Sequence, residues 1–180
     1  MAVDQRPWQL AAHVIGILPA KEQVETEQVE TMPSPAHRPV IERVFRKLGG
    51  QRALGADVAS EADLARLVHR RIRLAVLGRI QKAGFSKQEI DDLIIPARTL
   101  RHRKAKREPL SIEESDRLVR LARIQAQAED VFQDIDKANR WLREELGMLD
   151  GKPPLEVART EAGARLIEQL LAKLDWGAAA

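Results

Sequence analysis

The chain has 180 residues, of which 44% are hydrophobic and 32% charged, with no Cys and no Tyr. This length and balance allow one globular domain, or one domain with a small companion. The lack of cysteine excludes disulfides, thiol catalysis and cysteine-ligated zinc. No apolar run is long enough for a membrane helix, and the first residues lack the basic character of a secretory signal. We therefore expect a cytoplasmic protein with no membrane partner.

The net charge of +3 hides two regions of opposite charge. Residues 64–107 contain thirteen Lys and Arg against three Asp and Glu, a local charge of +10. Residues 129–180 contain seven against eleven, a local charge of −4. This separation indicates two partners of different character, although an acidic end is also typical of ordinary solvated helices.

The first part of the chain gives the weakest pattern. Residues 1–40 have no sustained period and are rich in Glu, Gln, Thr and Pro, which predicts a weakly ordered arm. A helix is expected near residues 39–50, ending at two glycines. From Asp63 onward, apolar residues recur every four positions, which predicts one amphipathic helix that ends at Gly84; they are Leu64, Val68, Ile72, Val76 and Ile80.

Capping boxes mark two later helix starts. Ser86 and Glu89 open a short helix, and Ser111 and Glu114 open a long one. Between them, Pro96 suits the first turn of a helix with the sequence PARTLRHRKAK. No stretch alternates as a strand would, so the expected fold class is all-α.

The last fifty residues predict three more helices. Asp136 is expected to cap KANRWLREEL, which ends at Gly147. Pro153 and Pro154 restart a short helix, and Thr160 caps the final one. That helix carries an apolar stripe which we expect to be buried, made of Leu166, Ile167, Leu170, Leu171 and Leu174.

The segment from Ser86 to Arg107 is a helix, a short turn and a second, strongly basic helix. This is the organisation of a helix-turn-helix, whose second helix lies in the major groove of DNA. Solvated arginines on an ordinary helical hairpin are the competing interpretation, because the spacing alone is common. The candidate DNA-binding residues are Arg98, Thr99, Arg101, His102, Arg103, Lys104, Lys106 and Arg107.

The order of motifs carries a resemblance. The segment AEDVFQDIDKANRWLREELGMLDGKPPLEVARTEAGARLIEQLLAKLDWG resembles the toxin-binding domain of the Xre/MbcA/ParS antitoxins. The preceding GFSKQEIDDLIIPARTLRHRKAK and SIEESDRLVRLARI resemble the Xre-like helix-turn-helix of the same family. The similarity spans roughly residues 63–178.

The resemblance implies a type II antitoxin whose partner is a RES-domain, NAD-consuming toxin. It also implies that the chain covers the toxin's active site, represses its own operon at operator DNA, and forms a homodimer or a larger assembly with the toxin. Trp141 lies at core spacing, whereas Trp176 follows the last periodic residue and suits an interface. The toxin-binding residues so implied are Trp141, Pro154, Leu155, Thr160, Glu161, Gly163, Leu170, Leu174, Trp176, Gly177, Ala178, Ala179 and Ala180.

The expected organisation is an N-terminal arm with short helices (1–60), a helix-turn-helix domain (61–128) and a small helical toxin-binding module with a tail (129–180). The alternative is a stand-alone helix-turn-helix regulator whose C-terminal module only dimerises. An enzyme is disfavoured, because the chain has neither a nucleophile arrangement nor a Gly-rich phosphate loop. No cofactor or metal is expected, since no two of the four histidines share a helix-face spacing; these are His13, His37, His69 and His102.

Overall fold

The computed structural model describes the backbone of residues 37–178 and the side chains of residues 40–175. The predicted N-terminal arm falls mostly outside these ranges. All described helices belong to one compact unit. In chain order they are α1 (His37–Lys47), α2 (Gly50–Leu54), α3 (Glu61–His69), η2 (Leu74–Val76), α4 (Leu77–Lys82), α5 (Lys87–Leu93), α6 (Ala97–Lys106), α7 (Ile112–Phe132), α8 (Ile135–Trp141), η3 (Gly147–Leu149), α9 (Pro154–Val157) and α10 (Glu161–Ala178). Within the described residues there is no strand, which confirms the all-α prediction.

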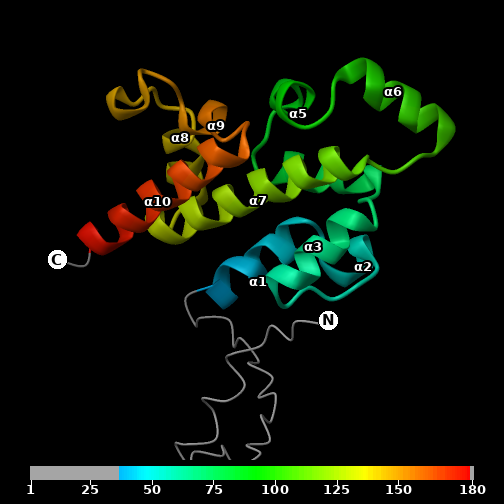
Figure 1. Ribbon diagram of the computed structural model, residues 1–180, viewed down its shortest axis with the longest axis horizontal. Helices are drawn as coiled ribbons and strands as arrows, with labels where there is room; N and C mark the ends of the chain where they lie inside the picture. The colour runs from blue at the N-terminus through cyan, green and yellow to red at the C-terminus, as the bar shows by residue number, and fades with distance from the viewer. Residues whose placement is uncertain (1–36, 179–180) are drawn as a thin grey trace, which may run out of the picture. The chain divides into compact units, whose positions relative to one another are not determined.

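The long helix α7 is the centre of the fold (Figure 1). It has 21 residues and packs against α1, α3, α8 and α10. Its side chains Leu118, Leu121 and Ile124 are almost completely buried. Two ion pairs fasten α1 along it: Arg43 to Asp130 at 2.7 Å and Lys47 to Glu129 at 2.6 Å.

The single helix predicted from Asp63 to Gly84 is wrong, because the chain breaks in its middle. Helix α3 ends at His69, Arg71 takes a left-handed φ of 63°, and the next turn begins at Leu74. The break lets the Ile72 N–H donate to the Ser115 hydroxyl of α7 at 3.0 Å, while the Ile72 carbonyl accepts from the Leu110 N–H at 2.9 Å. Two long-range hydrogen bonds thus replace one turn of helix.

Both capping boxes are confirmed. Pro96 lies directly before α6 as its N-cap, and not within the first turn of the helix as expected. The Ser86 and Ser111 hydroxyls accept from the N–H groups of Glu89 and Glu114, and each glutamate accepts in return from its serine N–H. The prediction for α8 was wrong at both ends. Asp134, and not Asp136, accepts from the first free N–H groups of that helix, which ends at Trp141 before a separate turn.

The late break in the chain is a compact connection between two helices. Asp150 and Gly151 both have positive φ, and Leu146 pairs with Lys152 in an isolated antiparallel bridge. Pro154 then takes the first turn of α9, and the Thr160 hydroxyl accepts from the Gly163 N–H at the start of α10. This tight turn brings the backbones of α9 and α10 into direct contact.

Gly163 is the residue that permits this contact, since a Cβ there would overlap the Val157 carbonyl oxygen. We therefore expect Gly163→Ala to lower the free energy of unfolding by about 1–3 kcal/mol. Gly78 on α4 is the matched control, because a Cβ there meets nothing within 4 Å. Gly78→Ala should raise the same free energy by about 0.5–1 kcal/mol, because alanine favours helix.

Urea unfolding followed by circular dichroism measures both changes. An unchanged midpoint for Gly163→Ala would contradict the close approach of α9 and α10.

Candidate nucleic-acid and protein interfaces

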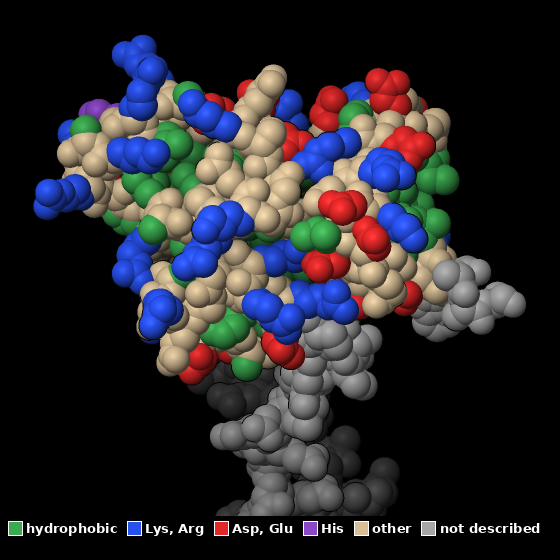
Figure 2. Space-filling model, turned by 180° about the vertical axis from the view of Figure 1, so that it is seen from behind, with side chains coloured by type: hydrophobic (Ala, Val, Ile, Leu, Met, Phe, Trp, Pro, Cys, Tyr) green, Lys and Arg blue, Asp and Glu red, His purple; other side chains and the backbone are tan. Residues whose placement is uncertain are grey.

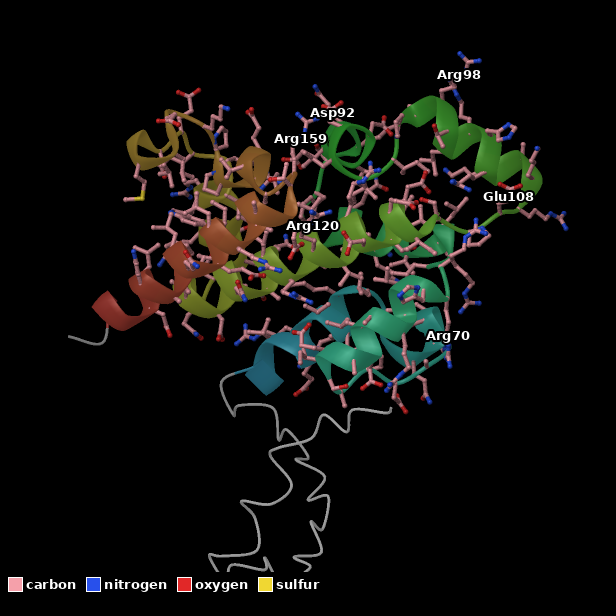
Figure 3. All side chains as sticks on the ribbon, viewed as in Figure 1. Arg70, Asp92, Arg98, Glu108, Arg120 and Arg159 are labelled. Atoms are coloured by element: carbon pink, nitrogen blue, oxygen red, sulfur yellow. The ribbon has the colours of Figure 1, made fainter. Side chains whose placement is uncertain are left out.

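Helix α6 is an exposed, cationic element: none of its residues is buried. Arg98, Arg101 and His102 are exposed and follow the i, i+3, i+4 spacing, so they share one helix face. Figure 3 shows Arg98 extending from α6 away from the rest of the molecule. This face has the length and the donors to reach base edges in a major groove.

One candidate, Arg103, lies differently from the others. Its side chain is only 16% exposed, and its Nε lies 2.9 Å from the Oε2 of Glu114 on α7. Glu114 is itself buried and caps α7 through the Ser111 N–H at 2.7 Å. A second carboxylate, Glu108, lies 3.5 Å from Arg103. The guanidinium therefore fixes α6 on α7 and is not offered to solvent as its neighbours are.

The turn between α5 and α6 is held equally firmly. Ile94 and Ile95 have no exposed surface, and the Arg117 guanidinium of α7 donates to the Ile94 carbonyl at 3.1 Å. No glycine is needed, since this turn has no positive φ. The two helices of the pair are thus rigidly placed relative to α7.

The remaining candidates on α6 lie on its sides and at its end. Thr99 is half-buried, whereas Lys104, Lys106 and Arg107 are exposed. On the face drawn in Figure 2, the edge that carries α6 shows Lys and Arg side chains with few Asp and Glu beside them, whereas the opposite half shows side chains of both charges. The basic character predicted from the sequence is therefore visible around α6.

In the C-terminal part, several of the residues predicted to bind the toxin also have a structural role. Pro154 and Leu155 are buried. Trp141 is half-buried, with its ring 5.5 Å from that of Phe132. Gly163 is required by the α9–α10 contact. These four residues shape the module, and Trp141 and Gly163 keep part of their surface exposed.

The apolar stripe predicted for α10 divides into two. Ile167 and Leu171 are buried as expected, but Leu166 and Leu174 are 48% and 38% exposed, and Leu170 is half-buried. The expectation that the whole stripe is buried was therefore wrong. The exposed part, Leu166, Leu170 and Leu174, recurs every four residues along one edge of α10, which we call the leucine edge.

The start and the end of α10 complete this surface. Thr160 and Glu161 are exposed, and Glu161 pairs with Arg165 at 3.2 Å. The backbone of the helix continues through Trp176 and Gly177 to Ala178. The side chains of these last three residues, and all of Ala179 and Ala180, fall outside the described part.

A polar junction, which sequence reasoning missed, joins α8 to the turn before α5. Arg143 donates to both carboxylate oxygens of Glu89, at 2.7 and 2.9 Å, and to the Gly84 carbonyl at 2.8 Å. Burial raises the pKa of Glu89, but the hydrogen bonds from Arg143 and Ser86 outweigh it and hold that pKa below its ordinary value. Spacing could not reveal the pair, because its members are 54 residues apart.

Gln125 of α7 also belongs to this junction. It is fully buried, and its amide donates to the Ala83 carbonyl at 2.5 Å and to the Asn139 side chain at 2.7 Å. Gly84, with φ 107°, is required here because a Cβ would overlap the Asn139 amide. The basic helix pair and the C-terminal helices are therefore linked by direct hydrogen bonds.

Among the described side chains, residues 40–175, no group of three or more His, Cys, Asp or Glu is arranged to hold a metal ion. None of the helices within residues 37–178 is both long and apolar enough to cross a membrane.

Comparison with known proteins gives two family matches. Residues 63–123 match the antitoxin Xre-like helix-turn-helix domain, and residues 127–177 match the antitoxin Xre/MbcA/ParS C-terminal toxin-binding domain. A Pseudomonas putida protein named "Antitoxin Xre" is 41% identical over 86 residues, which are 48% of this chain and 54% of the relative. A Sphingobium protein named "Prs ADP-ribosylating antitoxin" is 27% identical over 131 residues, 67% of this chain and 82% of the relative. The chain thus spans about half the length of the first relative.

The polar junction predicts a pH-dependent contribution to stability. In a double-mutant cycle, Arg143→Ala and Glu89→Gln should show a coupling of about 1 kcal/mol at neutral pH, because the pair is bidentate but partly solvated. Glutamine can still accept from the Ser86 N–H, so the cap is retained. Urea unfolding of the four proteins measures the coupling.

The sign of the pH effect follows from the lowered pKa of Glu89. The stabilisation is present above the unfolded-state pKa of about 4.3 and is lost as pH falls through the lower folded-state pKa. A coupling that stays constant down to about pH 3 would contradict the ion pair.

Proposed function

We propose that this chain, which belongs to the Xre/MbcA/ParS antitoxin family, neutralises a cognate toxin and binds operator DNA to repress its own operon. The family is one of antitoxins and not of enzymes, as expected from the sequence. The two family matches follow each other along the chain in the order expected for a DNA-binding domain and a toxin-binding domain.

The proposed toxin is a RES-domain enzyme that consumes NAD. The name of the Sphingobium relative refers to ADP-ribosylation, and ADP-ribosyl transfer takes its ADP-ribose from NAD. That name supports an NAD-consuming partner for this chain as well. Neutralisation then requires the chain to cover the active site of the toxin, and the assembly contains at least two antitoxin copies.

The observation that carries the toxin proposal is the leucine edge. Helix α10 buries one apolar face in the fold and leaves Leu166 and Leu174 exposed beside it. Exposed apolar side chains in a row suit a protein interface better than solvent. The helix ends of this module, with the exposed Thr160 and Glu161, and the residues from Trp176 to Ala180 extend the proposed contact.

Operator binding is proposed for the exposed face of α6. Arg98 and His102 are the proposed base readers, and Thr99, Arg101, Lys104, Lys106 and Arg107 the proposed phosphate contacts. Arg103 supports this surface by fixing α6 on α7.

We assign different functions to the parts of the chain: DNA binding to residues 61–128 and toxin binding to residues 129–180, after an N-terminal part at residues 1–60. Helix α7 crosses the second boundary without interruption. The two proposed functional regions therefore share one continuous helix.

The alternative is a stand-alone regulator that dimerises through the leucine edge. The same two exposed leucines would then contact a second copy of the chain. Expression together with the neighbouring gene separates the two functions, because only an antitoxin restores the growth and the NAD level of cells that make the neighbouring product.

The toxin proposal predicts that Leu166→Asp with Leu174→Asp abolishes protection in co-expression, because two carboxylates would enter an apolar interface. Deleting residues 176–180 should also reduce protection, since the proposed contact includes the end of α10. Growth and cellular NAD are the measurements.

Ile112→Asp is the matched control for the toxin experiment. Ile112 is 42% exposed at the start of α7, where a carboxylate suits the helix terminus. Full protection by the leucine variant, at equal protein level, would contradict the proposed site. Loss of protection by the control would show a general loss of fold.

The DNA proposal predicts that Arg101→Ala with Lys104→Ala weakens binding to all duplexes alike and makes it less dependent on salt. Arg98→Ala should in addition relax specificity, by about 1–3 kcal/mol at one base pair. Fluorescence anisotropy with a duplex from upstream of the chain's own gene, and with a scrambled duplex, gives both quantities. Unchanged affinity of the double variant at moderate salt would exclude α6 as the reading helix.

A further inference from the structure

A second cationic surface lies beside the C-terminal end of α6. A hollow of about 500 Å³ is lined by Arg70, Arg71 and Arg73 from the α3–η2 connection and by Lys104 and Arg107 from the end of α6. We call it the basic hollow. Its two halves come from segments more than thirty residues apart, so it exists only in the folded chain. Figure 3 shows Arg70 and Glu108 on the side of the molecule where α6 ends.

Two of these arginines occupy backbone positions that favour glycine. Arg71 has φ 63° and Arg107 has φ 56°, and they are two of the four non-glycine residues with positive φ in the described part of the chain. Glycine takes this conformation without steric cost at the ends of helices, as it does elsewhere in this fold at Gly55. An arginine in such a position is unfavourable for the backbone, which indicates that its side chain is used.

The charge of the hollow is not neutralised within the described structure. Its one acidic lining residue, Glu108, pairs with Arg103. Arg71 donates to the Leu110 carbonyl and Arg73 to the Ala53 carbonyl, and these neutral acceptors fix the guanidinium groups without cancelling their charge. Arg70, Lys104 and Arg107 are exposed. The result is a preorganised group of cations, two of which are held in place by the fold.

We propose that the basic hollow binds the phosphate backbone of duplex DNA beside the bases read by α6; this rests on the proposed operator binding. A helix in the major groove lies between the two phosphate backbones, and its C-terminal end leads out toward one of them. Arg107 ends α6, and Arg70, Arg71 and Arg73 lie beyond it. The hollow therefore extends the DNA contact from one helix to a segment more than thirty residues earlier in the chain.

The test compares Arg70→Ala with Arg107→Gly, combined in one protein, against wild type. Neither side chain donates a hydrogen bond within the described structure, and glycine relieves the backbone at position 107, so the variant should fold. If each arginine holds one phosphate, the slope of log Kd against log salt concentration should fall by about 1.8. The affinity at low salt should fall by roughly tenfold. Operator and scrambled duplexes should lose affinity by the same factor, because phosphates carry no sequence information.

Arg140→Ala with Lys152→Ala is the matched control. Both side chains are exposed on the C-terminal module, so this variant removes the same charge away from the hollow. It should bind DNA as wild type does. Equal losses in the two double variants would show a general charge effect and would overturn the proposal.

The remaining outcomes separate this inference from the proposed function. If Arg101→Ala weakens operator binding while the hollow variant does not change affinity or salt dependence, the hollow does not hold DNA. If the hollow variant loses binding to the toxin and not to DNA, its partner is an acidic protein surface and the inference is wrong. If the wild-type chain binds no duplex, both proposals fall.

Discussion

Three buried polar side chains on α7 fix the position of the basic helix pair and of the chain that leads into it. Glu114 receives Arg103 from α6, Ser115 receives the Ile72 N–H at the break after α3, and Gln125 holds the Ala83 carbonyl before α5. A buried polar group without a partner costs about 1–3 kcal/mol, so each of these contacts requires its partner to be in one position. Apolar packing alone would allow the helices to slide along α7. The polar contacts remove that freedom.

One consequence is that the two proposed binding surfaces are not independent bodies. Helix α10 packs on α7, the basic helix pair is held on α7 by Arg103–Glu114 and Arg117–Ile94, and Arg143, just after α8, pairs with Glu89 of the α5 capping box. A partner bound along α10 would contact helices that are hydrogen-bonded to the DNA-binding pair. Coupling between two binding sites requires at least such a connection, because both ligands must act on the same structural element, here the helices packed on α7.

Local signals were readable from the sequence, and contacts across the fold were not. The capping boxes at Ser86 and Ser111 were predicted correctly because a capping box is complete within four residues. The break at Arg71 was missed because no glycine or proline marks it; its cause is Ser115, more than forty residues away. On α10, the five apolar residues cover an arc of about 140° of the helix circumference. Periodicity identifies that arc but not which part of it the core covers, so Leu166 and Leu174 were wrongly placed inside.

The same distinction explains the basic region. Counting charges along residues 64–107 treats every arginine alike, whereas the fold assigns each one a different surrounding. Arg103 meets two carboxylates and serves to hold the helix pair, as does Arg117 of α7, which lies outside the counted stretch and binds the Ile94 carbonyl. An arginine keeps its charge available to a ligand where it contacts only a neutral carbonyl or solvent. Arg98 and Arg70, which are exposed to solvent, are of this kind. A cation that pairs with a buried carboxylate builds the surface, and only a cation without one can attract a phosphate to it.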